Sequence, residues 1–259
     1  MTPDLLDHWT TAEFWLHEMP WLRLAAYLVL STFVLGNIAT YLRFHRGWRD
    51  GDTRKLSHFG HMVIAAPLLA FLPPVQLLPA VTIGTVAVVL IYAVGATSTH
   101  KMLHGIVAGS LRERDKPHAR FFFFFPLIVG NLALVAAVFL FPIEMVRVAF
   151  FTAAIADGVA EPVGLRYGGD NKYKVPDLIW RSPNDKSVAG SLAVLFTATI
   201  IASVYFVVTT GLQLQHIVAV AVYGLAIAVL EALAPRGTDN MLLLFVGPVI
   251  MQAIVMAMP

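Results

Sequence analysis

Apolar runs of about 20 residues recur along almost the whole chain, and this feature restricts the fold more than any other. A membrane-spanning helix needs roughly 20 predominantly apolar residues in a row. Hydrophobic residues make up 58% of the sequence and charged residues 13%, with a mean hydropathy of +0.74, whereas soluble domains carry about 25% charged residues. The sequence therefore predicts an all-α fold, a polytopic membrane helix bundle.

The lengths of these runs predict about eight transmembrane helices. The turn signal LPP at 72–74 separates the short second run from the third. Residues 1–20 carry Trp9, Phe14 and Trp15 on one side, so we expect an amphipathic helix at the membrane interface. We expect 21–259 to form a single transmembrane catalytic domain. The predicted crossings are 21–42, 57–72, 75–98, 120–141, 144–166, 186–210, 213–233 and 240–258.

The basic residues predict the orientation of this bundle. Of the 18 Lys and Arg, only Arg23 and Arg147 lie outside the loops 43–55, 101–120 and 166–186 and the turn near 236. Eight crossings place these loops on one side, and cytoplasmic loops carry the excess of Lys and Arg. We therefore expect a multi-pass protein of the cytoplasmic (inner) membrane, with both termini outside.

The composition also excludes some kinds of site. The chain has no cysteine, so disulfides, thiolate metal sites and cysteine nucleophiles are excluded. The first 20 residues lack a basic start followed by an apolar core, and no cleavable signal peptide is expected. The net charge of +2 gives no indication of a nucleic-acid partner.

Two carboxylates lie inside the fifth predicted crossing. Asp157 and Glu161 are four residues apart and share one helix face. Each acid near a bilayer centre costs on the order of 2.5–3.5 kcal/mol on insertion scales. Protonation, or a salt bridge to Arg166, is one explanation; a divalent cation such as Mg²⁺, which takes oxygen ligands, removes the cost and the repulsion together. Pro162 leaves the Gly158 carbonyl without a helix partner, which indicates a kinked helix lining a polar cleft that opens to the cytoplasm.

A second cluster, KSVAGS at 186–191, is predicted to begin the sixth crossing. A capping box is expected from Ser182 to Asp185, with Pro183 at the first helical position. Helix N-terminal N–H groups beside a lysine and hydroxyls favour anions. Interfacial snorkelling and helix packing are the alternative explanations for this cluster. Its polar or small residues are Lys186, Ser187, Gly190 and Ser191.

A third cluster, EALAPRGTDN at 231–240, lies near the cytoplasmic end of the seventh crossing. Glu231 is another acid, and Asp239 or Asn240 is expected to cap the last helix. Acidic positions on three helices are thus predicted at one membrane depth.

Together these clusters resemble the membrane lipid-alcohol kinases, which include phytol, farnesol and dolichol kinases and are related to the phosphatidate cytidylyltransferases. The resemblance lies in ADGVAEPVGLRYG, KSVAGS and EALAPRGTDN, with RKLSH at 54–58 as a basic opening. It implies an alcohol-acceptor phosphotransferase that moves a phosphoryl group from CTP, or another nucleoside triphosphate, to an isoprenoid alcohol with Mg²⁺. The implied partners are the nucleotide, the membrane lipid alcohol and the bilayer, and an oligomer is compatible with the sequence.

The resemblance also implies roles for individual residues. Asp157, Glu161, Lys186 and Asp239 are the expected catalytic residues, and Asp157, Glu161 and Asp239 the expected Mg²⁺ ligands. His58 and Asp239 are alternative bases for the alcohol, and Glu231 and Lys55 are further candidates. The expected nucleotide-binding residues are Arg166, Lys174, Lys186, Ser187, Gly190, Ser191 and Asn240.

Two alternatives compete with this interpretation. A phosphatidate cytidylyltransferase also uses CTP and Mg²⁺, but its usual G-H-G-G stretch is absent from the sequence. An ion-coupled transporter could relay cations through Asp157 and Glu161 on broken helices, but the acid motif is not repeated in a second half of the chain.

Overall fold

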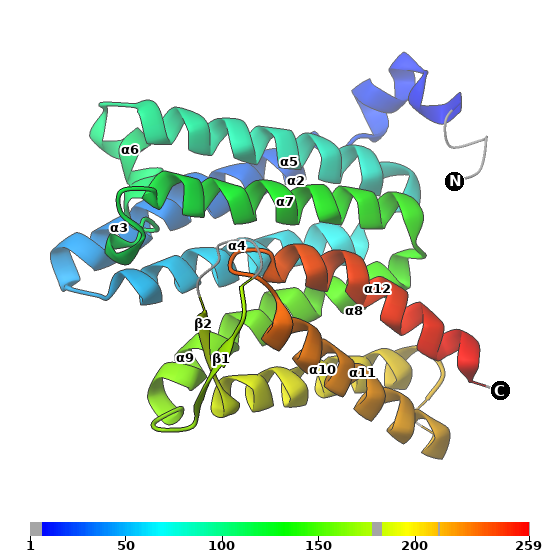
Figure 1. Ribbon diagram of the computed structural model, residues 1–259. Helices are drawn as coiled ribbons and strands as arrows, with labels where there is room; N and C mark the ends of the chain where they lie inside the picture. Colours follow the sequence, from blue (N-terminus) through cyan, green and yellow to red (C-terminus); the bar gives the residue numbers. More distant parts are fainter. Residues whose placement is uncertain (1–6, 178–182, 212, 259) are drawn as a thin grey trace. The chain divides into compact units, whose positions relative to one another are not determined.

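The computed structural model describes residues 7–177, 183–211 and 213–258 of the chain. These residues are almost entirely helical (Figure 1), so the predicted all-α fold is confirmed apart from one pair of short strands. The chain divides into two compact units, 1–131 with 138–140 (unit 1) and 132–137 with 141–259 (unit 2). Helix α7 (Ala119–Leu140) contributes to both. A single catalytic domain from residue 21 onward stays a prediction.

Six helical segments of the described chain are long and apolar enough to cross a membrane, by length and composition. The outer face of α10 carries Leu192, Phe196, Ile200 and Val204, spaced four residues apart and 45–63% exposed. Such a stripe favours contact with lipid, because soluble proteins rarely expose large contiguous apolar patches. The six segments are Trp21–Arg46 (α2, Trp21–Leu28; the π-helix η2, Val29–Val34; α3, Leu35–Arg46), α5 (Pro74–Thr97), α7, α10 (Val188–Thr209), α11 (Leu214–Leu233) and α12 (Asp239–Ala257).

The other two predicted crossings are helical but are not among these six segments. The second lies in α4 (Asp50–Phe71), whose first two turns carry Asp50, Asp52, Arg54 and Lys55. The fifth follows α8 (Ile143–Thr152), the π-helix η4 (Ala153–Asp157) and α9 (Gly158–Tyr167). Eight crossings, and termini on the outer side, therefore stay predictions.

The predicted interfacial segment is helical at 7–9 and 12–18, where 14–18 form the π-helix η1 (Phe14–Glu18). Phe14 is fully buried, and the indole Nε1 of Trp9 donates to the carbonyl of Val75 at 2.8 Å. Part of the aromatic side thus packs within unit 1, and its position at the membrane interface stays a prediction.

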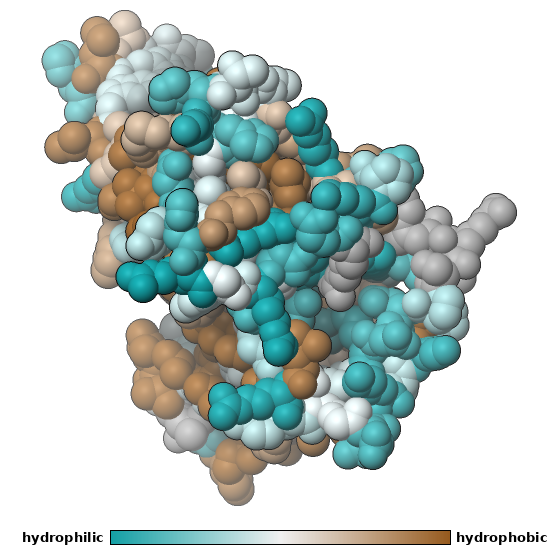
Figure 2. Space-filling view, turned by 90° about the vertical axis from the view of Figure 1, so that its left-hand side faces the viewer, coloured by the Kyte–Doolittle hydropathy of each residue, from teal (hydrophilic) through white to brown (hydrophobic). Residues whose placement is uncertain are grey.

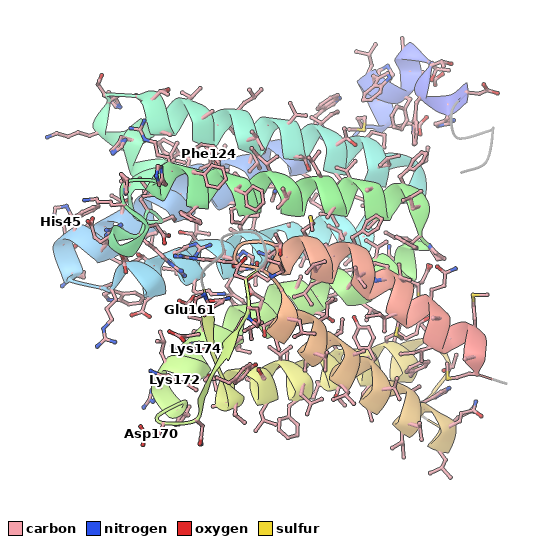
Figure 3. All side chains as sticks on the ribbon, in the orientation of Figure 1. His45, Phe124, Glu161, Asp170, Lys172 and Lys174 are labelled. Atoms are coloured by element: carbon pink, nitrogen blue, oxygen red, sulfur yellow. The ribbon has the colours of Figure 1, made fainter. Side chains whose placement is uncertain are left out.

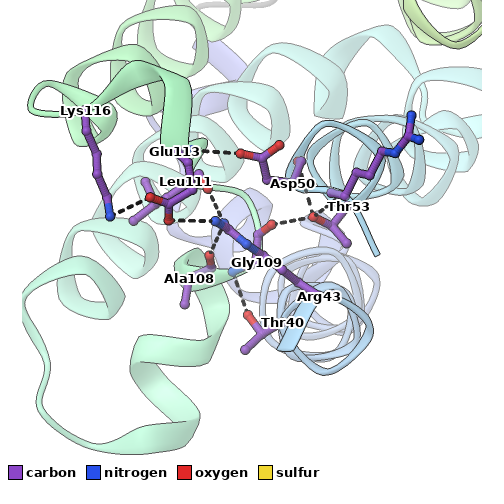
Figure 4. A network of polar contacts seen from close by, with 10 residues as sticks. Thr40, Arg43, Asp50, Thr53, Ala108, Gly109, Leu111, Glu113 and Lys116 are labelled. Carbon is purple, nitrogen blue, oxygen red and sulfur yellow. Dashed lines mark hydrogen bonds and ion pairs between the residues drawn. The ribbon is translucent and has the colours of Figure 1, made fainter. Parts of the chain in front are cut away.

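Unit 1 is held together by a close crossing of α3 and α6 (Lys101–Ala108). A Cβ on Gly36 would lie 2.4 Å from the carbonyl oxygen of Ile106, so only glycine fits at this crossing. The Thr40 hydroxyl donates to the carbonyl of Gly105 at 2.5 Å. It also accepts from the amide of Gly109 at 2.7 Å, the contact drawn in Figure 4. Side-chain bonds thus satisfy the backbone groups that the end of α6 leaves without helical partners.

The chain after α6 is fixed by polar contacts with α3 and α4 (Figure 4). Arg43 donates to the carbonyls of Ala108 and Leu111 and pairs with Glu113 at 3.1 Å. The Asp50 carboxylate accepts from the Glu113 amide at 2.7 Å. Partial burial alone would raise the pKa of Asp50, but this amide and the Arg43 charge outweigh it and hold the pKa below its usual range.

Unit 2 is built around α10, which packs on α11, α9 and α8, while α12 packs on α8 and α11. Small residues allow these approaches: Ala198 and Ala202 on α10 are fully buried. A Cβ on Gly224 of α11 would lie 2.0 Å from the Thr199 hydroxyl and 2.9 Å from the carbonyl of Leu195. Small interface residues of this kind let membrane helices pack backbone to backbone.

Candidate functional site

The acid pair lies on a helical path that changes its winding beside Asp157. The π-helix η4 ends at this residue, and α10 and α12 both pack against η4. Asp157 is buried at 4% exposure, and Glu161, one turn later on α9, is partly buried. Single π-helical turns often mark functional positions, and this one aims a buried carboxylate within unit 2. The helix expected at 144–166 is confirmed, and the irregularity within it is a π-helix that begins nine residues before Pro162.

The polar loop that follows α9 forms two antiparallel strands, which the sequence did not predict. Strand β1 (Lys172–Val175) pairs with β2 (Asn184–Ser187), and Tyr173 lies opposite Lys186. The Tyr173 hydroxyl bonds to the Ser191 hydroxyl at 2.6 Å, so the strands are attached to the first turn of α10. In Figure 3, Glu161 on α9 and Lys174 on β1 lie at the same end of unit 2, and hydrophilic side chains gather on the side that Figure 2 shows.

The sixth predicted crossing, 186–210, agrees with α10 within two residues, but the capping box predicted at its start is wrong, since Pro183 is not helical. Asp185 lies in β2 and Lys186 is still extended, whereas Ser182 lies outside the described residues. Ser187 is the N-cap of α10, and its hydroxyl accepts from the Gly190 amide at 3.1 Å. Strand pairing thus competes with the expected capping box, and the helix begins at Val188.

The glycines of the first two clusters are explained by a close crossing of α9 and α10. A Cβ on Gly164 would lie 2.5 Å from the Ser187 hydroxyl, and one on Gly190 would lie 2.9 Å from the carbonyl oxygen of Ala160. A Cβ on Gly168 would lie 2.9 Å from the Cβ of Ser187. These residues bring the start of α10 against the helix that carries the acids.

Lys186 lies at the centre of a buried charged group. Its ammonium donates to the Glu231 carboxylate, and also to the Glu231 carbonyl at 3.1 Å. The two side chains are 17% and 5% exposed. Burial alone would lower the pKa of Lys186, but the carboxylates of Glu231, Asp239 and Asp157 outweigh burial and raise it. The structure thus gathers around one ammonium the three acids that the sequence places on separate helices.

The turn between α11 and α12 differs from its prediction. Asp239 is the first residue of α12 and accepts from the Asn240 amide at 2.9 Å, while Thr238 is the N-cap and makes no side-chain capping bond. The expected capping by Asp239 or Asn240 is therefore wrong. The Arg236 amide donates to the buried Asp177 carboxylate at 2.8 Å. Asp177 was not among the predicted site residues, because an acid after V-P in a polar loop is a weak signal.

The remaining candidates lie around this group or outside it. Arg166 is exposed at the end of α9 and lies over the ring of Tyr167 at 5.7 Å. Lys174 is exposed on β1, opposite Asp185. The Asn240 Oδ1 atom is buried and accepts no hydrogen bond from the described residues. Lys55 and His58 lie on α4 of unit 1.

The carboxylates do not form a resident metal cage. Within the described ranges, no three His, Cys, Asp or Glu side chains are arranged to hold a metal ion. Asp157 and Asp239 nevertheless act on the same ammonium. This donor set fits a Mg²⁺ ion that arrives on a nucleotide, because such ions use one or two carboxylates together with phosphate oxygens.

Comparison with known proteins gives no family for the chain. The sequence matches no protein-family model, no curated protein and no solved structure.

Proposed function

We propose that this chain is a membrane kinase that transfers the terminal phosphoryl group of CTP to an isoprenoid alcohol. The observation that supports the proposal is the buried group around Lys186, to which β2, α11, α12 and η4 each contribute a charged side chain. Phosphoryl transfer requires mainly positioning and neutralisation of charge, and this group offers both. The proposed location is the inner membrane, with the site facing the cytoplasm.

Lys186 is the proposed ligand of the phosphate oxygens. Glu231 holds the ammonium from two sides, through its carboxylate and its carbonyl. A lysine oriented by a glutamate also contacts the nucleotide phosphates in protein kinases. The raised pKa of Lys186 keeps the ammonium charged at neutral pH, so it attracts a triphosphate throughout the physiological range.

Asp157, Asp239 and, one turn from Asp157, Glu161 are the proposed carboxylates toward Mg²⁺ on the triphosphate. When bound, the ion would neutralise charge on the transferring phosphoryl group. Asp239 is the proposed base that accepts the proton of the alcohol.

The start of α10 contributes mainly by shape in this proposal. Ser187 caps the helix and Gly190 packs against α9, so they place the positive end of the helix dipole near the phosphates. The Ser191 hydroxyl, bonded to Tyr173, is within the same turn. Additional nucleotide contacts are proposed for Arg166, Lys174 and Asn240.

Doubly labelled CTP tests the reaction. The purified protein in nanodiscs that contain an isoprenoid alcohol and phosphatidate is incubated with CTP labelled on the γ-phosphate or on the α-phosphate. A kinase moves only the γ label to lipid and releases CDP. A cytidylyltransferase moves the α label to lipid and releases pyrophosphate, and this outcome would refute the kinase proposal. A protein that binds no nucleotide would also refute it and would favour the ion-coupled transporter.

Asp157→Asn supplies the matched variant. We expect it to reduce Mg²⁺-dependent transfer by roughly 100-fold or more, because removal of one group that stabilises transition-state charge costs about that factor. Asp170→Asn, an exposed acid in the turn before β1, should retain full activity. Undiminished activity in folded Asp157→Asn would overturn the assigned role.

A further inference from the structure

Unit 2 contains a second polar site, at the end of α10, α11 and α12 opposite to Lys186. A cavity of about 260 Å³ lies where α10 and α12 end and α11 begins. In Figure 1 these ends lie beside the C-terminus, away from β1 and β2. The 22 residues of α10 span roughly 33 Å at 1.5 Å per residue, which matches the ~30 Å hydrocarbon core of a bilayer. In a bilayer that α10 crosses, the cavity and the Lys186 group would therefore lie at opposite faces.

A buried histidine gives this cavity a directed hydrogen-bond donor. His216 lines the cavity, is 4% exposed and stacks on Phe206 with ring centroids 4.4 Å apart. Its Nδ1 accepts from the Gln213 amide at 3.1 Å. A ring nitrogen that accepts a hydrogen bond carries no proton, so the proton of the imidazole lies on Nε2. The Nδ1 bond caps α11, and none of the described residues accepts from the Nε2–H group.

The lining specifies the kind of ligand. Val255, Met258 and Phe206 provide apolar surface, and Tyr205 and Gln215 add polar groups. None of the described residues that line the cavity is Asp, Glu, Lys or Arg, so no described side chain in its lining compensates a ligand's full charge. The volume is below the ~300–1,000 Å³ of pockets that enclose a whole drug-sized ligand. It suits one polar group at the end of an apolar chain.

We propose that this cavity binds the uncharged, hydrogen-bonding end of a neutral membrane lipid. The His216 Nε2–H group donates to an oxygen of the lipid, and the lipid chain lies along the apolar faces of the helices. A hydroxyl of a lipid alcohol and an ester carbonyl of a diacylglycerol both provide such an oxygen. The site does not depend on the kinase reaction, which is assigned to the opposite end of unit 2.

Photolabelling in phosphatidylcholine nanodiscs tests this site. The probes are hexadecanol with a diazirine beside the hydroxyl, a diacylglycerol with a diazirine beside the ester, and hexadecane with a terminal diazirine. Mass spectrometry measures labelling at 205–216 and 255–258. We expect at least one neutral polar probe to label these segments roughly five-fold more than hexadecane, the factor that one ordinary hydrogen bond contributes. The stronger of the two polar probes identifies the lipid class.

His216→Asn is the decisive variant, because an amide oxygen can replace the Nδ1 acceptor that caps α11 while the Nε2–H donor is lost. We expect it to lower polar-probe labelling to the hexadecane level. Tyr205→Phe provides a second variant that leaves the cap intact, and Val208→Thr, an exposed neighbour outside the lining, should label like the wild type. Equal labelling by all three probes, or unchanged labelling in both folded cavity variants, would refute the proposal.

Discussion

The ion pair of Lys186 and Glu231 allows the structural and functional roles of the charged group to be separated. Both side chains are largely buried, at 17% and 5% exposure, and Asp157 and Asp239 act on the same ammonium. Loss of one partner from a buried pair costs about 3–5 kcal/mol. We expect Lys186→Met to lie near the lower limit, about 3 kcal/mol, because Glu231 can take up a proton instead of remaining charged. This corresponds to a fall in Tm of roughly 6–12 °C for a chain of this size.

A double-mutant cycle with Glu231→Gln measures the pair. Glu231→Gln alone should cost less, about 1 kcal/mol, because Asp157 and Asp239 still attract the ammonium and the amide still accepts from it. The double variant should be more stable than the sum of the two losses predicts, by about 2 kcal/mol. Thermal unfolding in nanodiscs, with nucleotide binding measured on the same samples, provides both quantities. Lys172→Met on exposed β1 is the control and should change stability by less than about 0.5 kcal/mol.

The result that would refute this reasoning is simple additivity of the two losses. If the pair is the main role of Lys186, the double variant should regain nucleotide binding together with stability. The proposed function requires the opposite result: nucleotide binding is lost in Lys186→Met and stays lost in the more stable double variant.

Two further predictions concern packing and pH. Gly164→Ala should destabilise unit 2 by about 1–3 kcal/mol, because its Cβ would lie 2.5 Å from the Ser187 hydroxyl. Gly84→Ala, whose Cβ would lie 3.4 Å from its nearest neighbour, should be tolerated. Comparable Tm values for the two variants would contradict this prediction. The lowered pKa of Asp50 means that its ionised form stabilises the fold above the unfolded pKa and that this contribution is lost as the pH falls through the folded pKa. Asp50→Asn should therefore lower Tm at pH 7 but approach the wild type below about pH 4, and a Tm difference that does not change with pH would rule this out.

The helical content and the acids inside apolar runs were predictable because they depend on local pattern. Apolar runs near 20 residues predict helices whatever they pack against, and acids inside such runs stand out by their cost. Asp157 and Glu231 were identified in this way, and the structure places both near Lys186. Six candidate spans are found in the described chain rather than eight. The two that are missing contain the charged start of α4 and the acidic η4–α9 segment, and hydropathy alone does not decide whether such segments cross a membrane.

Features that depend on tertiary contacts were not predictable. The strands β1 and β2 are four residues each, with mostly polar sequences and no clear alternation; attachment of Tyr173 to Ser191 supports them. Once β2 extends to Ser187, the first residue free to begin a helix is Val188, and the local capping signal at Asp185 has no effect. Asp177 was missed for the same reason, because its partner is the amide of Arg236, 59 residues away.

Packing accounts for only part of the motif residues, and the remainder supports the proposed chemistry. Gly164, Gly190 and Ser187 are explained by the crossing of α9 and α10 and by the cap of α10. The charged residues are not explained in this way, since well-packed apolar side chains in place of a buried ion pair are often neutral or stabilising. Asp157 and Asp239 act on both Lys186 and Glu231. A buried group with this many charges is not needed for stability alone, which favours a functional role. A ligand that carries both phosphates and a divalent cation complements the ammonium and the carboxylates together, and for this reason we favour a nucleotide over a transported ion.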